Sequence, residues 1–231
     1  MPYFYSNIQH SDYFKNIWSD WLNNIDFLNN TIDIDSLKKL FPNIDWTLNT
    51  FYRKYFKHRF IEAQKNFAES LAGYSLLIYI LNIKDRHNGN ILVDSEGHII
   101  HIDFGFFLTN TPGSLRFEQA PFKLTQEYIE ILDGDCSPMF YYFKSLLCKS
   151  FLILRKYVDE IMLPLKIMEN SGMPCFSGGN WGLIEMQKRI EQFKNEISTI
   201  SIVEQLIEES KNNWWTNQYD NFQKISNNIS V

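Results

Sequence analysis

A short β-hairpin pattern among helical patterns is the feature that most limits how this sequence can fold. Two apolar runs, at 91–94 and 98–103, flank the turn Ser95-Glu96-Gly97, and a Glu-Gly turn between such runs is typical of a hairpin. The longer apolar segments before and after it have helical spacing instead. The sequence therefore predicts a mainly α fold with a small β-hairpin.

Helical spacing is clearest between residue 50 and a buried segment at 75–83. Aromatic and apolar residues recur there at near-helical intervals, with no glycine or proline before Gly73, and predict one long helix. Pro164 is expected to kink or split one of the later helices, and 104–123 is expected to be a long surface loop. The helical segments predicted beyond the hairpin are 124–132, 139–168, 183–197 and 200–225.

Charge and cysteine content narrow the possible partners and compartment. Lysine and arginine number 22 and aspartate and glutamate 27, so the net charge is −5. This charge gives no general attraction to nucleic acid, and membrane contact must be local. Cys136, Cys148 and Cys175 show no paired spacing and fit reduced thiols in a cytosolic protein. We expect neither a signal peptide nor a membrane-spanning helix.

The expected register of the hairpin brings two polar side chains together. With a two-residue turn, Ser95 lies opposite His98 and Asn90 lies opposite Asp103. An amide oxygen and a carboxylate then meet at one end of the hairpin, and such hard oxygen ligands suit Mg²⁺. In this register the core face carries Ile91, Val93, Ile100 and Ile102, and the other face carries Asn90, Leu92, His101 and Asp103.

The polar segment just before the hairpin contains the side chains of a phosphoryl-transfer site. Asp85, Arg86 and His87 precede Asn90, and an Asp-Phe-Gly sequence follows the hairpin at 103–105. Asp85 lies five residues before Asn90, which is the offset between the catalytic Asp and the metal-binding Asn of the protein-kinase loop H-R-D-x-x-x-x-N. Here the triplet is inverted to Asp-Arg-His.

Together, the segments 85–90 and 101–105 resemble those of the phosphatidylinositol 3-/4-kinase superfamily. The resemblance implies the kinase-like C-lobe of this superfamily over residues 51–231, with residues 1–50 as an unassigned N-terminal extension. Within the superfamily, the chain resembles the phosphatidylinositol 4-kinases, closest to the type III beta form. The further segments that carry this resemblance are 63–67, 72–74, 97–103, 120–125, 173–176 and 219–223.

The resemblance implies transfer of the γ-phosphate of ATP to the inositol 4-hydroxyl of phosphatidylinositol, with ATP and Mg²⁺ as cofactors. Asp103 would bind Mg²⁺ and Asn90 would complete the metal site. Asp85 and His87 would serve at the substrate hydroxyl and the γ-phosphate. Which of these two takes the proton stays open, although a neutral histidine is a suitable base at cytosolic pH.

The adenine floor that the resemblance implies consists of Leu92 and Ile102. The expected hairpin register places these two side chains on opposite faces. Either twist rotates Ile102 toward the nucleotide, or one of the two assignments is wrong.

Taken singly, most of these residues have ordinary structural explanations. Asp85 can cap a helix, 88–89 is a common turn dipeptide, and Arg86 suits an ion pair better than a phosphate contact. His98 and His101 lack a zinc-ligand spacing and are expected to be structural. The combined spacing, and no single residue, favours function.

Basic residues after Asp103 bear on the lipid headgroup. Arg116 and Lys123 are the only ones before Leu124, whereas an already phosphorylated inositol would need several cations. Their scarcity favours unphosphorylated phosphatidylinositol. Arg116 and Lys123 are both candidate substrate contacts, and capping of the following helix is the alternative for Lys123.

Trp214 and Trp215 lie in the last amphipathic segment. Core packing is the simpler interpretation, and the alternative is that they enter a membrane interface, as tryptophans often do. By resemblance, we expect a cytoplasmic protein that is peripheral on intracellular membranes and Golgi-like in location.

A phosphate-binding N-lobe is not recognised in the sequence and is expected to be absent. No glycine precedes Gly73, and neither a β-rich segment nor a lysine strand is found before residue 50. The chain is either a catalytic lobe whose N-lobe is lost or separately encoded, or a non-catalytic remnant that binds a membrane or a partner. The segments 120–125 and 219–223 disfavour a related protein kinase. We expect little or no turnover from this chain alone.

Overall fold

The computed structural model describes residues 30–40, 47–112 and 120–230 of the chain. The chain divides into two compact units, Met1–Thr31 and Ile32–Val231, and the first lies almost wholly outside the described residues. The second is mainly helical with one small sheet, as predicted. Its helices and strands, with the strand that leads into it, are β1 (Thr31–Asp33), α3 (Ile34–Leu40), α4 (Leu48–Phe56), α5 (Phe60–Leu81), β2 (Ile91–Asp94), β3 (Ile99–His101), α6 (Gln126–Ile131), α7 (Pro138–Leu154), α8 (Val158–Met168), α9 (Trp181–Glu191), α10 (Glu196–Ser210) and α11 (Trp214–Asn227), and the short 3₁₀ turns are Lys57–Arg59, Asn88–Asn90, Arg155–Tyr157 and Pro174–Phe176.

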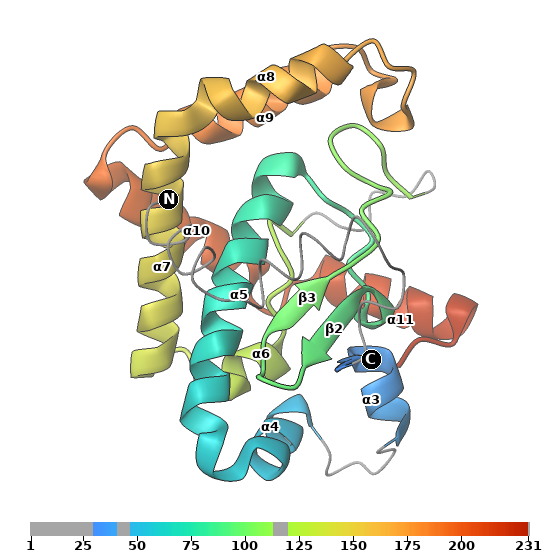
Figure 1. Cartoon of the computed structure of the whole chain (residues 1–231), viewed down its shortest axis with the longest axis vertical. Helices are drawn as coiled ribbons and strands as arrows, with labels where there is room; N and C mark the ends of the chain where they lie inside the picture. The colour runs from blue at the N-terminus through green and yellow to red at the C-terminus, as the bar shows by residue number, and fades with distance from the viewer. Residues whose placement is uncertain (1–29, 41–46, 113–119, 231) are drawn as a thin grey trace. The chain divides into compact units, whose positions relative to one another are not determined.

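Helix α5 forms the centre of the core. It packs against α4, α7, α9 and β3, and Figure 1 shows it between α7 and the β2–β3 hairpin. Phe67, Leu71 and Ala72 on α5 are at most 2% exposed. Full burial of a side chain the size of Phe or Leu contributes about 1.5–3 kcal/mol. In the described part of the chain, no helix is both long and apolar enough to cross a membrane.

The long helix predicted from residue 50 to the buried segment is in fact two helices, so that prediction is wrong at one point. A 3₁₀ turn at Lys57–Arg59 separates α4 from α5, and Lys57 has a positive φ of 47°. The break lets α4 pack against α5, so that the rings of Tyr52 and Phe67 meet edge to face at 5.5 Å. Apolar spacing continues through a short 3₁₀ turn, and spacing alone therefore misses it.

Three later breaks also differ from the prediction. The segment 183–197 is divided, because α9 ends at Glu191 and α10 begins at Glu196. The segment 139–168 is divided by the 3₁₀ turn Arg155–Tyr157, whereas Pro164 lies inside α8. The segment 200–225 is divided between α10 and α11, because the backbone turns at Asn212, where φ is 45°. Asn213 then caps α11 by accepting a hydrogen bond from Trp215 N over 2.9 Å.

The hairpin is present as predicted, but its register differs by one residue. Ile91 lies opposite His101 and Leu92 opposite Ile100. The turn therefore has three residues, 95–97, and is closed by a hydrogen bond from Asp94 N to His98 O over 3.0 Å. Gly97 supplies the left-handed backbone of this turn, with a φ of 91°. The Asp94 carboxylate also favours this three-residue turn, because it accepts hydrogen bonds from the main-chain nitrogens of residues 96 and 98 at 2.9 and 2.8 Å.

A shift of one residue moves every side chain of a strand to the other face. Asn90 is now paired with Ile102, whose nitrogen donates to Asn90 O over 3.0 Å, and not with Asp103 as predicted. Leu92, Ile100 and Ile102 consequently share one face, and the conflict between the register and the adenine floor disappears. His101 moves to the opposite face, where its ring lies 4.6 Å from the ring of Tyr74 on α5. The third strand, β1, was not predicted, and the sheet order is β1-β2-β3.

Candidate active site

The Asp-Arg-His loop, which we define as residues 84–90, connects the end of α5 to the start of β2. Two residues at this junction have left-handed backbone, Asn82 with a φ of 51° and Asp85 with a φ of 66°. Asn and Asp tolerate this conformation better than most residues, because their short side chains hydrogen-bond locally. The loop is held to the segment after β3 by a hydrogen bond from Lys84 N to Phe106 O over 2.9 Å.

Arg86 ties the two halves of the site together. Its side chain donates to three main-chain carbonyls: Lys84 O and Ile102 O, each over 2.8 Å, and Asp103 O. The residue is only 3% exposed, so the planar guanidinium bridges the loop and the end of the hairpin from within. These contacts give Arg86 a structural role through main-chain carbonyls, and the carboxylate ion pair that the sequence suggested stays a prediction.

Asn90 and Asp103 lie at the same end of the hairpin, and both side chains carry oxygen atoms that could bind a metal ion. Asn90 Nδ2 donates to Asp85 O over 2.9 Å, which leaves Oδ1 as the acceptor of that amide. Asp103 is exposed and accepts from Gly105 N at 3.2 Å. Among the described residues, no three His, Cys, Asp or Glu side chains form a metal-binding group. A single carboxylate with one amide oxygen nevertheless fits Mg²⁺, which takes its remaining ligands from phosphate and water.

The imidazole of His87 is half-buried and makes no hydrogen bond within the described part of the chain. Its Nε2 lies 3.8 Å from Asp85 Oδ1, and its Nδ1 is buried with no partner among the described residues. Burial lowers the pKa of His87 below its ordinary value; the Asp85 carboxylate opposes this effect, while the cations of Lys123 and Arg86 add to it. His87 is therefore neutral near pH 7 and able to accept a proton.

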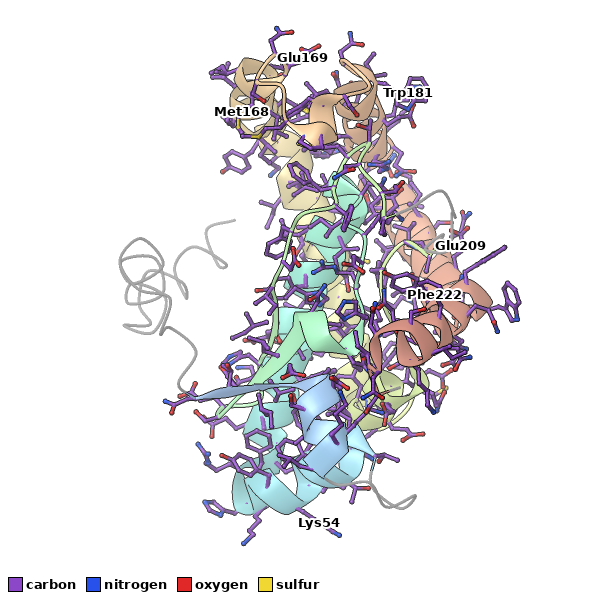
Figure 2. The ribbon with its side chains drawn as sticks, turned by 90° about the vertical axis from the view of Figure 1, so that its right-hand side faces the viewer. Lys54, Met168, Glu169, Trp181, Glu209 and Phe222 are labelled. Carbon is purple, nitrogen blue, oxygen red and sulfur yellow. The ribbon has the colours of Figure 1, made fainter. Side chains whose placement is uncertain are left out.

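Helix α11 contributes side chains that sequence reasoning did not assign to the site. Tyr219 donates from its hydroxyl to Asp85 Oδ1, and Gln223 Nε2 donates to that hydroxyl over 2.7 Å. Figure 2 shows α11 alongside the hairpin, with Phe222 labelled on it. The available signal was the four-residue interval between Tyr219 and Gln223, which places both on one helix face. The contact of Tyr219 with Asp85 was not foreseeable, because more than 130 residues separate Tyr219 from Asp85.

Lys123 lies next to the loop, where its ammonium is paired with a carboxylate and an amide oxygen. Its ammonium donates to Asp220 Oδ1 over 2.8 Å and to Asn88 Oδ1 over 3.1 Å, and the side chains of Lys123 and Asp220 are 3% and 7% exposed. Thr125, not Lys123, caps the following helix, so the capping alternative is wrong. A substrate contact for Lys123 stays a prediction, and Arg116 lies outside the described residues.

Leu92 and Ile102 form an apolar surface on the shared face of the hairpin. Leu92 is 6% exposed and Ile102 is half-buried. The tryptophans of α11 behave differently: Trp214 is 60% exposed and Trp215 half-buried, with their rings edge to face at 4.7 Å. Core packing does not describe Trp214, and the membrane contact stays a prediction.

A comparison with known protein families agrees with this geometry. The family model described as phosphatidylinositol 3- and 4-kinase matches residues 6–178. The chain belongs to this family. The match begins inside the segment 1–50, for which the motifs suggested no assignment, and the division at residue 50 stays a prediction.

Curated relatives narrow the family to the phosphatidylinositol 4-kinases. Phosphatidylinositol 4-kinase beta 2 of Arabidopsis thaliana is 46% identical over 212 residues, 89% of this chain and 19% of the relative. Phosphatidylinositol 4-kinase of Dictyostelium discoideum is 44% identical over 209 residues, 89% and 18% of the two chains. Phosphatidylinositol 4-kinase beta of Callithrix jacchus is 39% identical over 203 residues, 87% and 25%. The chain thus spans about a fifth to a quarter of the length of these relatives.

Proposed function

We propose that this chain transfers the γ-phosphate of ATP to the 4-hydroxyl of phosphatidylinositol. The main support is the arrangement of Asp85, His87, Asn90 and Asp103, which Arg86 joins into one site through the main-chain carbonyls of residues 84, 102 and 103. The names of the relatives, which are phosphatidylinositol 4-kinases, support the same reaction class.

In the proposed site, Asn90 and Asp103 hold Mg²⁺, which neutralises the charge of the nucleotide phosphates. His87 is the base that takes the proton of the inositol hydroxyl. We favour it over Asp85 because its Nε2 lies beyond hydrogen-bond distance of Asp85 and its pKa is lowered, whereas Asp85 already accepts a hydrogen bond from Tyr219. Asp85 orients the hydroxyl and stabilises the protonated imidazole.

The nucleotide base is proposed to rest on Leu92 and Ile102, since the observed register puts both on one face of the hairpin. The lipid is proposed to be unphosphorylated phosphatidylinositol. The charge of Lys123 is balanced by Asp220, and it is therefore not a free cation for a second phosphate.

The lipid requires contact with a membrane, and the exposed Trp214 is the proposed anchor, at intracellular and Golgi-like membranes by resemblance. Binding to phosphatidylinositol vesicles by flotation tests this contact. We expect the variant with both Trp214→Ala and Trp215→Ala to float less than the parent. Equal flotation of the two proteins would remove the anchor from the proposal.

Phosphate transfer tests the function itself. Because the chain is a fraction of the length of its relatives, we would place residues 32–230 in the corresponding position of the Arabidopsis beta 2 enzyme and supply radiolabelled ATP with phosphatidylinositol vesicles. We expect a labelled lipid whose headgroup is phosphorylated at the 4-position. A folded hybrid without transfer would support the alternative, a non-catalytic lobe.

A further inference from the structure

Tyr219 connects α11 to the Asp-Arg-His loop with a hydrogen bond of defined direction. The residue is 4% exposed, and its hydroxyl oxygen accepts from Gln223 Nε2 over 2.7 Å. Since that oxygen already accepts one hydrogen bond, its own proton is directed to Asp85 Oδ1. A hydrogen bond from a phenol to a carboxylate is charge-assisted and stronger than one between neutral groups.

Hydrogen bonds to Asp85 support its left-handed backbone. A φ of 66° is uncommon for a residue other than glycine and persists where the surroundings hold it. Here the Asp85 carbonyl accepts from Asn90 Nδ2 at 2.9 Å, and Oδ1 of its carboxylate accepts from Tyr219. Asn90 Nδ2 also lies 3.5 Å from Asp85 Oδ2, so Asn90 contacts both the main chain and the carboxylate of Asp85, while Tyr219 holds the other carboxylate oxygen.

The same carboxylate oxygen faces a second group. His87 Nε2 lies 3.8 Å from Asp85 Oδ1, just beyond hydrogen-bond distance. In this structure the phenol of Tyr219 donates to that oxygen and Gln223 Nε2 lies 3.5 Å from it, whereas His87 does not reach it. A carboxylate released by the phenol has a partner within a short movement.

We propose that Tyr219 is a positioning residue, which holds the Asp85 carboxylate apart from His87 and so leaves His87 Nε2 able to accept the proton of the substrate hydroxyl. The catalytic meaning of this inference rests on the proposed function. A separate tether, the buried ion pair of Lys123 with Asp220, keeps α11 in place without Tyr219. Removal of the phenol oxygen alone should therefore loosen the loop without undocking the helix.

Residue-resolved hydrogen exchange on the full chain tests the proposal with the variant Tyr219→Phe. The amides of Asn90 and Ile102, which donate to His87 O and Asn90 O over 3.0 Å each, report on the loop. We expect both to exchange roughly tenfold faster in the variant, while the amides of α7 keep the exchange rates of the parent. The matched control is Tyr52→Phe, which removes another buried hydroxyl, one that donates to Gly97 O over 2.9 Å.

Two more readouts separate positioning from general stability. The ¹³C resonance of the Asp85 carboxyl should shift in Tyr219→Phe and stay in place in Tyr52→Phe. In phosphate transfer, Tyr219→Phe should lower kcat about tenfold and leave the KM for ATP within about twofold.

The proposal is overturned if Asn90 and Ile102 exchange as in the parent, or if the α7 amides accelerate by the same factor. It is also overturned if the Asp85 resonance does not move. Exchange and resonance are measured without turnover. A parent chain that transfers no phosphate therefore counts against the proposed function alone, and the exchange comparison still decides the role of Tyr219.

Discussion

The half-buried His87 and the buried His101 have different surroundings. In both, Nδ1 is buried without a partner among the described residues, and burial is the main cause of a lowered pKa. His87 borders the Asp85 carboxylate, which opposes the effect of burial. The ring of His101 lies against Tyr74, and its pKa falls well below the ordinary value. His87 therefore suits proton transfer, whereas His101 is a neutral core residue near pH 7.

His101 should make the folded chain less stable in mild acid. The unfolded histidine binds a proton near pH 6.5, whereas the folded one does so only at a much lower pH. At pH values between these two pKa values, the unfolded state binds more protons than the folded state. The free energy of unfolding therefore keeps its full value above pH ~6.5 and falls by up to ~1.4 kcal/mol per pH unit below pH ~6.5. The variant His101→Phe keeps a ring against Tyr74 and should reduce this slope.

Urea unfolding at about pH 7 and about pH 5.5 measures the effect. His58, which is exposed, provides the control variant His58→Phe, which removes a surface imidazole and leaves the contact of His101 with Tyr74 in place. The account of His101 is wrong if His101→Phe and the parent lose the same free energy of unfolding between the two pH values.

The proximity of side chains was predictable where the residues are close in sequence. Asp85, His87 and Asn90 lie within one short segment, and their spacing alone indicated a phosphoryl-transfer loop. The contacts from α11 were not predictable, because Tyr219 and Asp220 reach the loop and Lys123 only through the tertiary fold.

At the scale of elements, apolar spacing predicted which segments are helical but not where each helix ends. The 3₁₀ turns at Lys57–Arg59 and Arg155–Tyr157 preserve the apolar pattern while redirecting the chain. The hairpin register was missed for a related reason. Apolar residues on both strands fit either register, and the turn chemistry of Asp94 and Gly97 decides between them.

Gly97 should tolerate replacement by a residue with a side chain poorly. A Cβ there would lie 2.7 Å from Ala63 Cβ, and the φ of 91° is strained for any other residue. We expect Gly97→Ala to lower the free energy of unfolding by about 2–4 kcal/mol, measured by urea unfolding.

The matched control for this prediction is Gly134→Ala. Gly134 has a similar φ of 93° but open space around its Cβ position, so its replacement carries the backbone strain alone and should cost about 1–2 kcal/mol. Equal losses at the two sites would show that close packing against α5 does not hold the turn.

At the scale of the molecule, elements from both ends of the described chain enclose the Asp-Arg-His loop. Asn88 Nδ2 donates to Ser230 O over 2.8 Å, and Ser230 N donates to Asp35 Oδ1 on α3 over 2.6 Å. The loop therefore contacts α3, the hairpin and α11 at once (Figure 1). This enclosure explains why the resemblance of local segments to a kinase family implied a kinase-like lobe but not the network that supports its loop.

Phosphate transfer by the hybrid enzyme, compared between Asp103→Ala and the parent sequence, tests the central claim most directly. Asp135→Ala is the matched control, since Asp135 is an exposed carboxylate that pairs with Lys211 away from the loop. We predict that Asp103→Ala lowers formation of the 4-phosphorylated lipid by about a hundredfold or more, because an electrostatic group at the phosphate is lost, and that Asp135→Ala leaves it unchanged. Equal transfer by Asp103→Ala and the parent would contradict the account.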